Sequence, residues 1–347
     1  MSGTSLDGLD ICLADFSGRE NKLEYEIESA ETIPYSDEWK NKLLLAEKCV
    51  GAELMGLHSE YGKFLGEQVL QFLKKIPKEK YPQLISSHGH TIFHRPEAGY
   101  TFQLGSGEFL AHTCKIPVVC DFRSTDVALG GQGAPLVPIG DRLLFGEYEY
   151  CLNLGGFANI SFEKSGKRIA FDICPVNYVL NRLANRVGKE FDGSGKISSS
   201  GKIIPELLEK LDSLSFYKKS PPKSLGREWV EEMVFPLLSS NEKTEDLLRT
   251  FTEHIAGQIS AQCNSRGKML ATGGGAYNDF LISRLREKCI PEIIIPEKNI
   301  VDFKEALVFA LLGWLRWNNK INVLSSVTGA SADSSSGSIC KYGTIYQ

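Results

Sequence analysis

The chain begins with a glycine-rich loop that leads directly into an apolar stretch. Gly3 and Gly8 flank the hydroxyls of Thr4 and Ser5 and the carboxylate of Asp7. Glycines let a backbone approach a ligand closely and adopt positive φ, so this pattern is typical of a loop whose N–H groups bind phosphate. Acids beside such a loop can hold a hydrated Mg²⁺ against the same phosphates. The same residue types also make ordinary surface turns, so the loop alone leaves both interpretations open.

Composition narrows the classes of protein that the chain can belong to. Its 347 residues predict about two domains, and its net charge of −4 offers no basic surface for nucleic acid. The longest apolar run, 306–315, is too short to span a bilayer, and no export signal opens the chain. Nine cysteines without a C-x-x-C pair argue against a disulfide framework. We therefore expect a cytoplasmic protein with neither a nucleic-acid nor a membrane partner.

The order of the expected elements indicates an α/β organisation that is repeated once. After the first loop we expect paired strands at 9–16 and 22–33, an amphipathic helix over 54–72, and short buried strands at 84–87 and 117–122. The order then recurs in outline, with strands at 148–154, 159–163 and 168–173 followed by helices. This pattern predicts two lobes with a cleft between them. We expect the first lobe to comprise residues 1–122 plus about 327–347, and the second to comprise residues 123–326.

Further glycine loops and acids follow these strands in a characteristic order. Asn153, Gly155 and Gly156 form a second glycine hairpin, and Asp172 closes a later strand. The run 273–275 stands between a strand and a helix, where bare backbone can pack against a flat ligand such as adenine. In this order the features resemble the ATPase cleft shared by acetate and sugar kinases, heat-shock ATPases and actin. That resemblance implies a duplicated ribonuclease H-like fold with a nucleotide cleft between its lobes.

The chain more closely resembles the anhydro-N-acetylmuramic acid kinase family, from residue 1 to about residue 330. The matching motifs are 3–10, 87–91, 94–96, 103–105, 121–123, 126, 130–138, 153–159, 222–228, 271–276, 278, 303–306 and 327–330. The resemblance implies a kinase that uses ATP and Mg²⁺ in peptidoglycan recycling. Such an enzyme opens the 1,6-anhydro ring of anhydro-N-acetylmuramic acid with water and phosphorylates O6, giving N-acetylmuramic acid 6-phosphate.

The resemblance assigns a catalytic base and two sugar-binding residues. It maps the base onto Asp172, whose alternative role is to cap the end of a strand. Arg123 suits the lactyl carboxylate of the sugar because its planar fork matches a carboxylate, and its alternative is an ion pair with Asp121 or Asp126. Glu305 could hydrogen-bond the sugar or form a surface ion pair.

The remaining implied site residues fall on the loops already described. For ATP and its phosphates they are Gly3, Thr4, Ser5, Leu6, Asp7, Gly8, Leu9 and Asp10, then Asn153, Gly155 and Gly156, then Gly273, Gly274 and Gly275. His88 and Gln132 join Arg123 and Glu305 in the expected sugar site. Asp7 and Asp10 are expected to hold Mg²⁺ through water. A metal on His88 and His90 is less favoured, because no acid or cysteine stands near them.

Three departures from the family pattern affect these expectations. Where the family reads D-x-G-P-G-N, Cys174 and Val176 replace glycines, which could keep the backbone away from the sugar. Gly140-Asp-Arg142 stands where related chains carry an aromatic residue and a histidine. The apolar strand that should precede the first loop is missing, because only Met1 and Ser2 precede Gly3. We therefore expect the natural protein to start upstream with such a strand, and strands 9–16 and 84–87 to flank a gap.

Three functions stay open from the sequence. The first is the anhydro-sugar kinase, the second is another amino-sugar kinase of the same superfamily, and the third is a non-catalytic sugar or nucleotide sensor. Retention of Asp172 together with Asp7 and Asp10 favours an enzyme, because a sensor needs neither a base nor a metal-holding acid. The expected partner is the small-molecule sugar, and a homodimer is left open.

Overall fold

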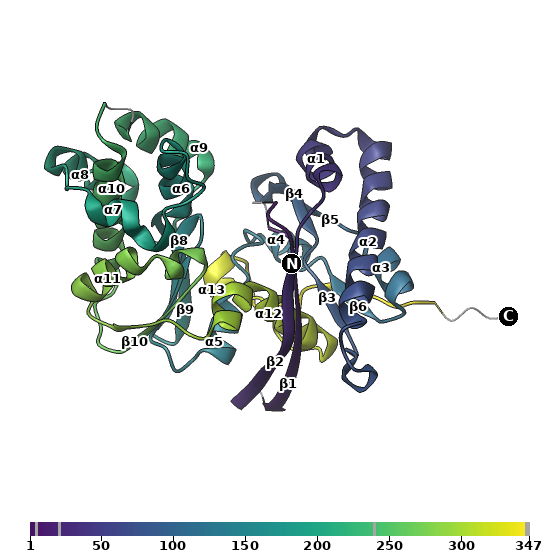
Figure 1. Ribbon diagram of the computed structural model, residues 1–347. Coiled ribbons are helices and arrows are strands. Elements are labelled where there is room, and N and C mark those ends of the chain that lie inside the picture. The colour runs from purple at the N-terminus through teal and green to yellow at the C-terminus, as the bar shows by residue number, and fades with distance from the viewer. Residues whose placement is uncertain (4–5, 20–21, 239–240, 344–347) are drawn as a thin grey trace. The chain divides into compact units, whose positions relative to one another are not determined.

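The chain forms two compact units, which we describe separately. The computed structural model describes residues 1–3, 6–19, 22–238 and 241–343 (Figure 1). Unit 1 comprises Met1–Leu144 and Phe303–Gln347, and unit 2 comprises Phe145–Asp302. Thr4 and Ser5 of the first glycine loop lie outside the described residues.

Unit 2 is built on a five-stranded mixed sheet. Its strands are β7 (Tyr150–Leu154), β8 (Phe157–Lys164), β9 (Lys167–Pro175), β10 (Lys268–Thr272) and β11 (Glu292–Ile294). The spatial order is β11-β10-β7-β8-β9. The first three strands form an antiparallel meander, and β10 and β11 add in parallel beside β7. An antiparallel meander extended by parallel strands on the side of its first member is the ribonuclease H-like order.

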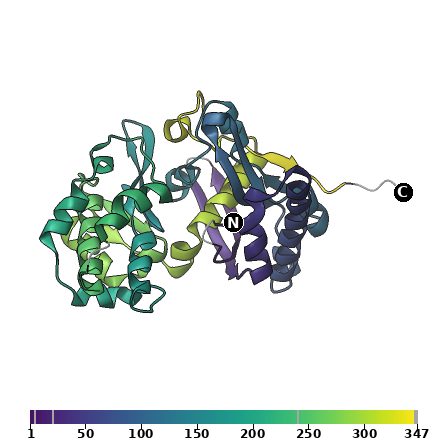
Figure 2. The same cartoon turned by 90° about the horizontal axis from the view of Figure 1, so that it is seen from above.

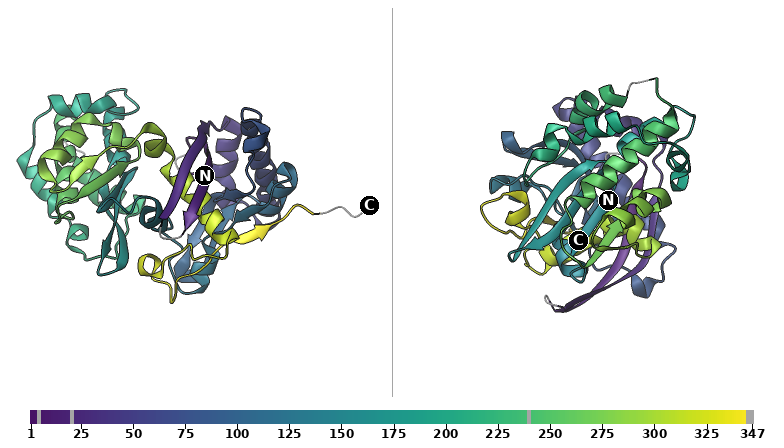
Figure 3. Two further views of the ribbon diagram at one scale, coloured as in Figure 1. Left: turned by 90° about the horizontal axis from the view of Figure 1, so that it is seen from below. Right: turned by 90° about the vertical axis from the view of Figure 1, so that its left-hand side faces the viewer.

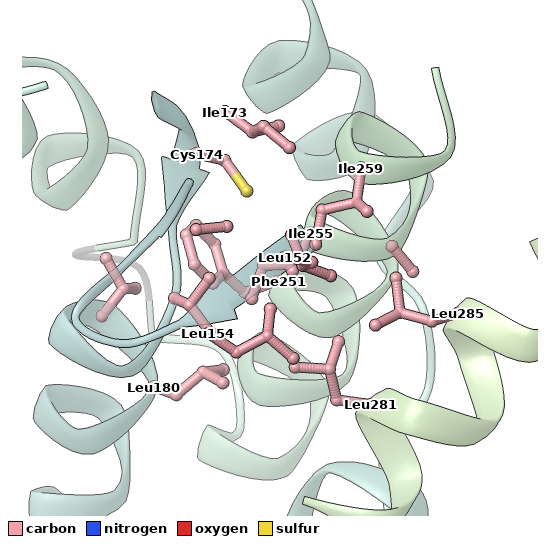
Figure 4. Packing of buried hydrophobic residues seen from close by; sticks show 14 of the residues in the cluster. Leu152, Leu154, Ile173, Cys174, Leu180, Phe251, Ile255, Ile259, Leu281 and Leu285 are labelled. Carbon is pink, nitrogen blue, oxygen red and sulfur yellow. The ribbon is translucent and has the colours of Figure 1, made fainter. Parts of the chain in front are cut away.

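Helices supply the core that packs on this sheet. They are α6 (Asn177–Asn185), α7 (Lys196–Ser200), α8 (Pro205–Asp212), α9 (Arg227–Trp229), α10 (Thr244–Ser260) and α11 (Asp279–Lys288). Leu152 and Leu154 share one face of β7, because side chains alternate along a strand. Figure 4 shows them against Phe251 and Ile255, which lie one turn apart on α10, and against Leu281 of α11. Burial of this apolar set anchors the edge of the sheet that carries the glycine turns.

Unit 1 has strands in three groups. The hairpin of β1 (Leu9–Arg19) and β2 (Lys22–Ile33) extends beyond the rest of the unit (Figures 1 and 3). Strands β3 (Ile85–Ser87) and β6 (Val118–Cys120) pair in parallel, and β12 (Ser338–Cys340) joins β6 at the edge (Figure 2). The third group, a hairpin of β4 (His90–Arg95) and β5 (Tyr100–Leu104), was not anticipated from the sequence.

Ser2 occupies the position of an inner strand in unit 1. It forms an antiparallel bridge with Leu9 of β1 and a parallel bridge with His90 of β4. These are the partners and directions that the first strand of a ribonuclease H-like order would have. Strand β1 pairs only with β2 among the named strands of the described residues, and it does not pair with β3. An upstream strand continuing from Ser2, with the gap that its loss would leave, stays a prediction.

The helices of unit 1 include the one expected over 54–72, which is α2. They are α1 (Asp37–Leu45), α2 (Gly51–Leu73), α3 (Gly107–Cys114), α4 (Ser124–Ala128), α5 (Pro138–Leu144), α12 (Lys298–Trp317) and α13 (Ser325–Thr328). The Oγ atom of Ser36 accepts a hydrogen bond from the N–H of Trp39 and so caps α1. Leu57, Tyr61 and Leu65 recur at four-residue spacing and form the buried stripe of α2, which packs along α3 (Figure 1).

The boundaries between the units differ from those expected. Residues 123–144 and 303–326 were assigned to the second lobe, but both segments pack within unit 1. Gly140 of α5 lies against Val308 of α12, where an added Cβ atom would come within 2.4 Å of the valine side chain. A buried ion pair of 2.7 Å between Lys304 Nζ and Asp141 Oδ1 joins the same two helices. Contacts between segments so far apart leave no local sequence pattern, so the sequence did not predict these boundaries.

The α/β class and its ribonuclease H-like strand order are confirmed. Within the described ranges, none of the helices is both long enough and apolar enough to cross a bilayer.

Candidate functional site

The first glycine loop is closed at its base by backbone pairing. The N–H of Asp10 donates to the carbonyl oxygen of Met1 at 2.9 Å, and the N–H of Leu6 donates to that of Gly3 at 3.3 Å. Gly8 is required sterically, because a Cβ atom there would lie 2.7 Å from the carbonyl oxygen of Ile33. The described residues on both sides of Thr4 and Ser5 are therefore held against the open end of the β1–β2 hairpin.

Two carboxylates stand on this loop. The side chain of Asp7 is exposed, and that of Asp10 is half-buried. The Asp10 Oδ1 atom accepts a hydrogen bond of 2.6 Å from Thr32 Oγ1. The loop thus presents one fixed and one solvent-exposed acid.

A buried chain of hydroxyls lies beneath the loop and ends on a histidine. The Tyr35 hydroxyl donates to Ser2 Oγ at 2.7 Å and lies 2.6 Å from the hydroxyl of Tyr61. Ser2 Oγ lies 2.9 Å from Nδ1 of His90. Because Tyr35 donates to Ser2, the Ser2 hydroxyl is free to donate to Nδ1, which leaves the proton of the neutral ring on Nε2. Desolvation lowers the pKa of His90 to about 4.

A second histidine holds the guanidinium of Arg123. Nε and Nη2 of Arg123 lie 3.1 and 3.0 Å from His88 Nε2, and Nη1 donates to the carbonyl oxygen of Gly133 at 2.6 Å. Burial, and then the charge of Arg123, keep the pKa of His88 well below its usual value. Burial also lowers the pKa of Arg123, and the carboxylate of Glu305 offsets part of that effect. Arginine has five N–H donors, so part of the fork stays available to an anion.

The alternative partners considered for Arg123 are engaged elsewhere. Asp121 Oδ1 accepts from the backbone N–H and the hydroxyl of Ser124. Asp126 is fully buried and accepts from the N–H of Gly133 at 2.7 Å and from Thr328 Oγ1 at 2.7 Å. Arg123 makes no ion pair with either acid in the described part of the chain, so this interpretation is wrong.

Gln132 and Glu305 are both exposed in unit 1. The backbone N–H of Gln132 donates to the carbonyl oxygen of Thr328 at 2.9 Å, which fixes the glycine loop around it while its side chain stays in solvent. Glu305 projects from α12 and forms no ion pair within the residues that the structure describes. The surface ion pair considered as its alternative role is therefore not found.

In unit 2 the two glycine motifs meet around Leu154, at one end of the sheet. A Cβ atom on Gly273, whose φ is +81°, would lie 2.6 Å from Asn153 Oδ1, and one on Gly275 would lie 2.7 Å from Leu154 Cβ. Asn177 donates from Nδ2 to the Leu154 carbonyl oxygen at 3.1 Å. A side chain at either position would collide with Asn153 or Leu154, so these positions require glycine.

Asp172 lies beside an irregularity in β9. Asn159 pairs with Asp172 and Ala158 with Cys174, so Ile173 is an extra residue that forms a β-bulge. The Oδ2 atom of Asp172 accepts a hydrogen bond of 2.9 Å from the N–H of Leu225. Its Oδ1 atom has no hydrogen-bond partner in the described part of the chain. Desolvation raises the pKa of this carboxyl group, and the bond from Leu225 opposes the rise.

The expected site residues therefore gather in two sets, one in each unit. The set in unit 1 combines the first loop with His88, Arg123 and Glu305. The set in unit 2 combines Asp172 with the two glycine turns. Each set joins an acid that can handle protons or metal to backbone that a phosphate could approach.

Comparison with known proteins decides the family. The profile of the family described as Anhydro-N-acetylmuramic acid kinase matches residues 1–342. The chain belongs to this family.

Proteins named anhydro-N-acetylmuramic acid kinase are similar over almost their whole length. That of Microcystis aeruginosa is 32% identical, with 96% of each chain covered. That of Crocosphaera subtropica is 34% identical over 95% of this chain and 94% of its own. The Bacillus cereus protein is 32% identical with the same coverage.

Two of the departures from the family pattern have a structural explanation. Cys174 and Val176 are fully buried members of the core of unit 2, and Figure 4 shows Cys174 beside Ile173 among the core side chains. Their side chains therefore pack into the core of unit 2, and the approach of their backbone to the sugar stays a prediction. Asp141, the middle residue of the other departure, pairs with Lys304, which directly precedes Glu305.

Proposed function

We propose that this chain is an ATP-dependent kinase of anhydro-N-acetylmuramic acid that acts in the cytoplasm in peptidoglycan recycling. It opens the 1,6-anhydro ring with water and phosphorylates O6. Membership of the family supports the choice of substrate. The observation that carries the mechanism is the hydrogen bonding of Asp172: one carboxylate oxygen accepts from Leu225, and the other has no hydrogen-bond partner among the described residues.

Asp172 serves as the general base. Its Oδ1 atom takes a proton from water as the water oxygen bonds to C1 of the sugar. The C1–O6 bond breaks, O6 bonds to the γ-phosphorus of ATP, and ADP leaves. Partial burial raises the pKa of Asp172, which makes the carboxylate a stronger base than an exposed aspartate.

Arg123 binds the lactyl carboxylate of the sugar. His88 and Gly133 fix the guanidinium from one side and leave N–H donors of the fork for the substrate. Glu305 and Gln132, both exposed, hydrogen-bond sugar hydroxyls or the N-acetyl group. A pre-oriented guanidinium loses little freedom when the sugar binds, which favours a single orientation of the ring.

The glycine turns of both units bind ATP. Residues 3–10 and the 153–156 turn contact phosphates, and 273–275 packs against the adenine. Asp7 and Asp10 fit Mg²⁺ held mostly by water and phosphates, because Mg²⁺ takes only one or two carboxylates in such sites. Within the described residues, no cluster of three or more acids, histidines or cysteines could hold a metal unaided. When bound, Mg²⁺ neutralises phosphate charge.

The test is turnover of anhydro-N-acetylmuramic acid by the purified protein with ATP and Mg²⁺, run in ¹⁸O-labelled water. We expect a product heavier by one water and one phosphoryl group, with the label on the anomeric carbon and none in the phosphate. N-acetylglucosamine and N-acetylmuramic acid are the control substrates. Faster phosphorylation of either control would favour another amino-sugar kinase, and ATP or sugar binding without turnover would favour a sensor.

A further inference from the structure

The segment that follows α8 crosses β9 at Asp172. The backbone N–H of Asp172 donates to the carbonyl oxygen of Lys223 at 3.1 Å, and the N–H of Leu225 returns a bond of 2.9 Å to Asp172 Oδ2. Strand β9 lies at the edge of its sheet in the described part of the chain, so an N–H that points away from β8, as that of Asp172 does, is available to this segment. We call residues 213–226 the strap.

The strap is anchored by a buried histidine that no step of the proposed reaction uses. His254 of α10 is completely buried, and its Nδ1 atom lies 2.6 Å from Asp212 Oδ1. Its Nε2 atom lies 2.9 Å from the hydroxyl of Tyr217. A carboxylate only accepts, so Nδ1 carries a proton, and in the neutral ring Nε2 accepts from Tyr217. Burial raises the pKa of Tyr217, which keeps its hydroxyl protonated and able to donate.

Aromatic contacts continue this anchor toward Asp172. The ring of Phe216 is buried and lies 5.3 Å from that of Trp229. The ammonium of Lys223 stands 4.8 Å from the centre of the Phe216 ring and 5.8 Å from that of Phe171, the residue before Asp172. The strap is thus fixed in its first half by Tyr217 and near its end by Lys223, two residues before Leu225.

We propose that the strap is a positioning element for the catalytic base, in which the Leu225 N–H holds Asp172 Oδ2 and thereby directs Oδ1 at the attacking water. Tyr217 and His254 keep the strap in place. This inference rests on the proposed function, because it assigns Asp172 the role of base. It adds a backbone donor in the 222–228 motif, for which the sequence predicted no role, and a remote anchor that lies outside the matching motifs.

The hydrogen bond from Leu225 has an electrostatic consequence as well as a geometric one. A donor to a carboxylate favours its ionised form, whereas burial favours the neutral form. The other groups near Asp172 are the Lys223 ammonium, which lies over aromatic rings, the amide of Asn159 across the ladder, and the buried Cys174 thiol. Loss of the Leu225 N–H would leave burial with less opposition and raise the pKa of Asp172 further.

The test replaces single backbone amides of the strap by esters. Leucic acid in place of Leu225 removes only the N–H that binds Asp172, and glycolic acid in place of Gly226 is the matched control, because no partner of that N–H is found within the described residues. We expect the acid limb of the kcat/KM profile to move up by about one pH unit for the ester at 225 only. Superimposable profiles for the two esters would overturn the inference.

A second pair of variants keeps the test decisive if the ester protein folds poorly. Tyr217→Phe removes the anchoring hydroxyl, and Tyr150→Phe removes a buried hydroxyl that binds Ser265 in the same unit. We expect kcat to fall about 3- to 10-fold for Tyr217→Phe, with an unchanged KM for ATP, and to stay near the parent value for Tyr150→Phe. Equal kcat in the two variants would refute the anchor. Lack of turnover in the parent protein would instead refute the proposed function.

Discussion

His88 accepts from Arg123 through Nε2, at 3.1 Å from the arginine Nε, while its Nδ1 lies 2.9 Å from the carbonyl oxygen of Gly89. A carbonyl and an arginine can each play only one part in a hydrogen bond, so the ring is neutral with its proton on Nδ1. Its low pKa keeps it so across the physiological range. The pair is therefore a fixed acceptor and an oriented cation, which suits recognition of a carboxylate without a pH switch.

Replacing the acceptor should weaken sugar binding more than ATP binding. His88→Phe keeps an aromatic ring against Phe309 but leaves the Nε of Arg123 without its partner. We expect a loss of about 1–3 kcal/mol in unfolding free energy. We also expect a KM for the sugar that rises about tenfold or more, because bonds to charged groups are among the strong ones. Steady-state kinetics and chemical denaturation measure the two effects.

The matched control is His112→Phe, since His112 is exposed on α3. It should change neither quantity. A His88→Phe protein with reduced stability but the parent KM for the sugar would show that the histidine supports only the core.

Removing the charge of Asp172 should abolish turnover. Asp172→Asn keeps an oxygen that can accept from Leu225 but cannot take a proton from water. We expect kcat to fall by about 10²- to 10⁴-fold, the usual cost of losing a general base, with ATP affinity nearly unchanged. Single-turnover kinetics and calorimetric ATP titration check this, with the exposed Asp37→Asn as control. More than half of the parent rate in Asp172→Asn would remove Asp172 from the mechanism.

Much of the fold could be predicted because local patterns determine it. The four-residue spacing of Leu57, Tyr61 and Leu65 allows only one buried stripe, so the position of α2 followed directly. The hairpin of β4 and β5 was missed because His90, Thr91, His94 and Arg95 interrupt the apolar alternation that marks a strand. The register of β4 is set by its pairing with β5 and by the bridge between His90 and Ser2. Neither contact can be read from the residues of β4 alone.

In the candidate site, too, the residue types could be predicted from the sequence but their hydrogen-bond partners could not. Glycine turns and strand-end acids are visible as residue types in order, so Asp172 and Gly273 could be named. Their partners could not, because the partner of Arg123 lies 35 positions away and that of Asp172 lies 53 positions away. Leu225 lies in the 222–228 motif, but it contributes only its backbone N–H, so its residue type does not reveal the bond to Asp172.

A methyl group at the adenine-side turn should block nucleotide binding. Gly273→Ala combines a strained positive φ with a Cβ atom 2.6 Å from Asn153 Oδ1 and 3.0 Å from the Leu154 backbone. Gly166→Ala is the matched control, because Gly166 also has positive φ, at +75°, but nothing lies within 4 Å of an added Cβ atom. Both should lose about 1–2 kcal/mol to backbone strain. Only Gly273→Ala should weaken ATP binding, by at least tenfold in a calorimetric titration. Equal ATP affinities in the two variants would place the nucleotide elsewhere.

The buried His90 should make unit 1 sensitive to mild acid. The folded protein holds His90 at a pKa of about 4, whereas an unfolded chain has about 6.5. Below pH 6.5 the unfolded chain binds a proton that the folded protein cannot, so stability falls until about pH 4 and then levels off. The expected loss is about 3 kcal/mol for this group. His88, with its lowered pKa, acts in the same direction, so the test must isolate His90.

His90→Gln isolates it, because the glutamine oxygen can accept from Ser2 Oγ as Nδ1 does, yet the side chain does not titrate. Denaturation midpoints measured between pH 7.5 and 4.5 should fall less steeply for His90→Gln than for the parent, with the two proteins diverging below pH 6.5. The exposed His112→Gln should keep the slope of the parent. Parallel curves for His90→Gln and the parent would mean that His90 takes up a proton in the folded protein as readily as in the unfolded chain, and its Nδ1 would then donate to Ser2 Oγ while that oxygen still accepts from Tyr35.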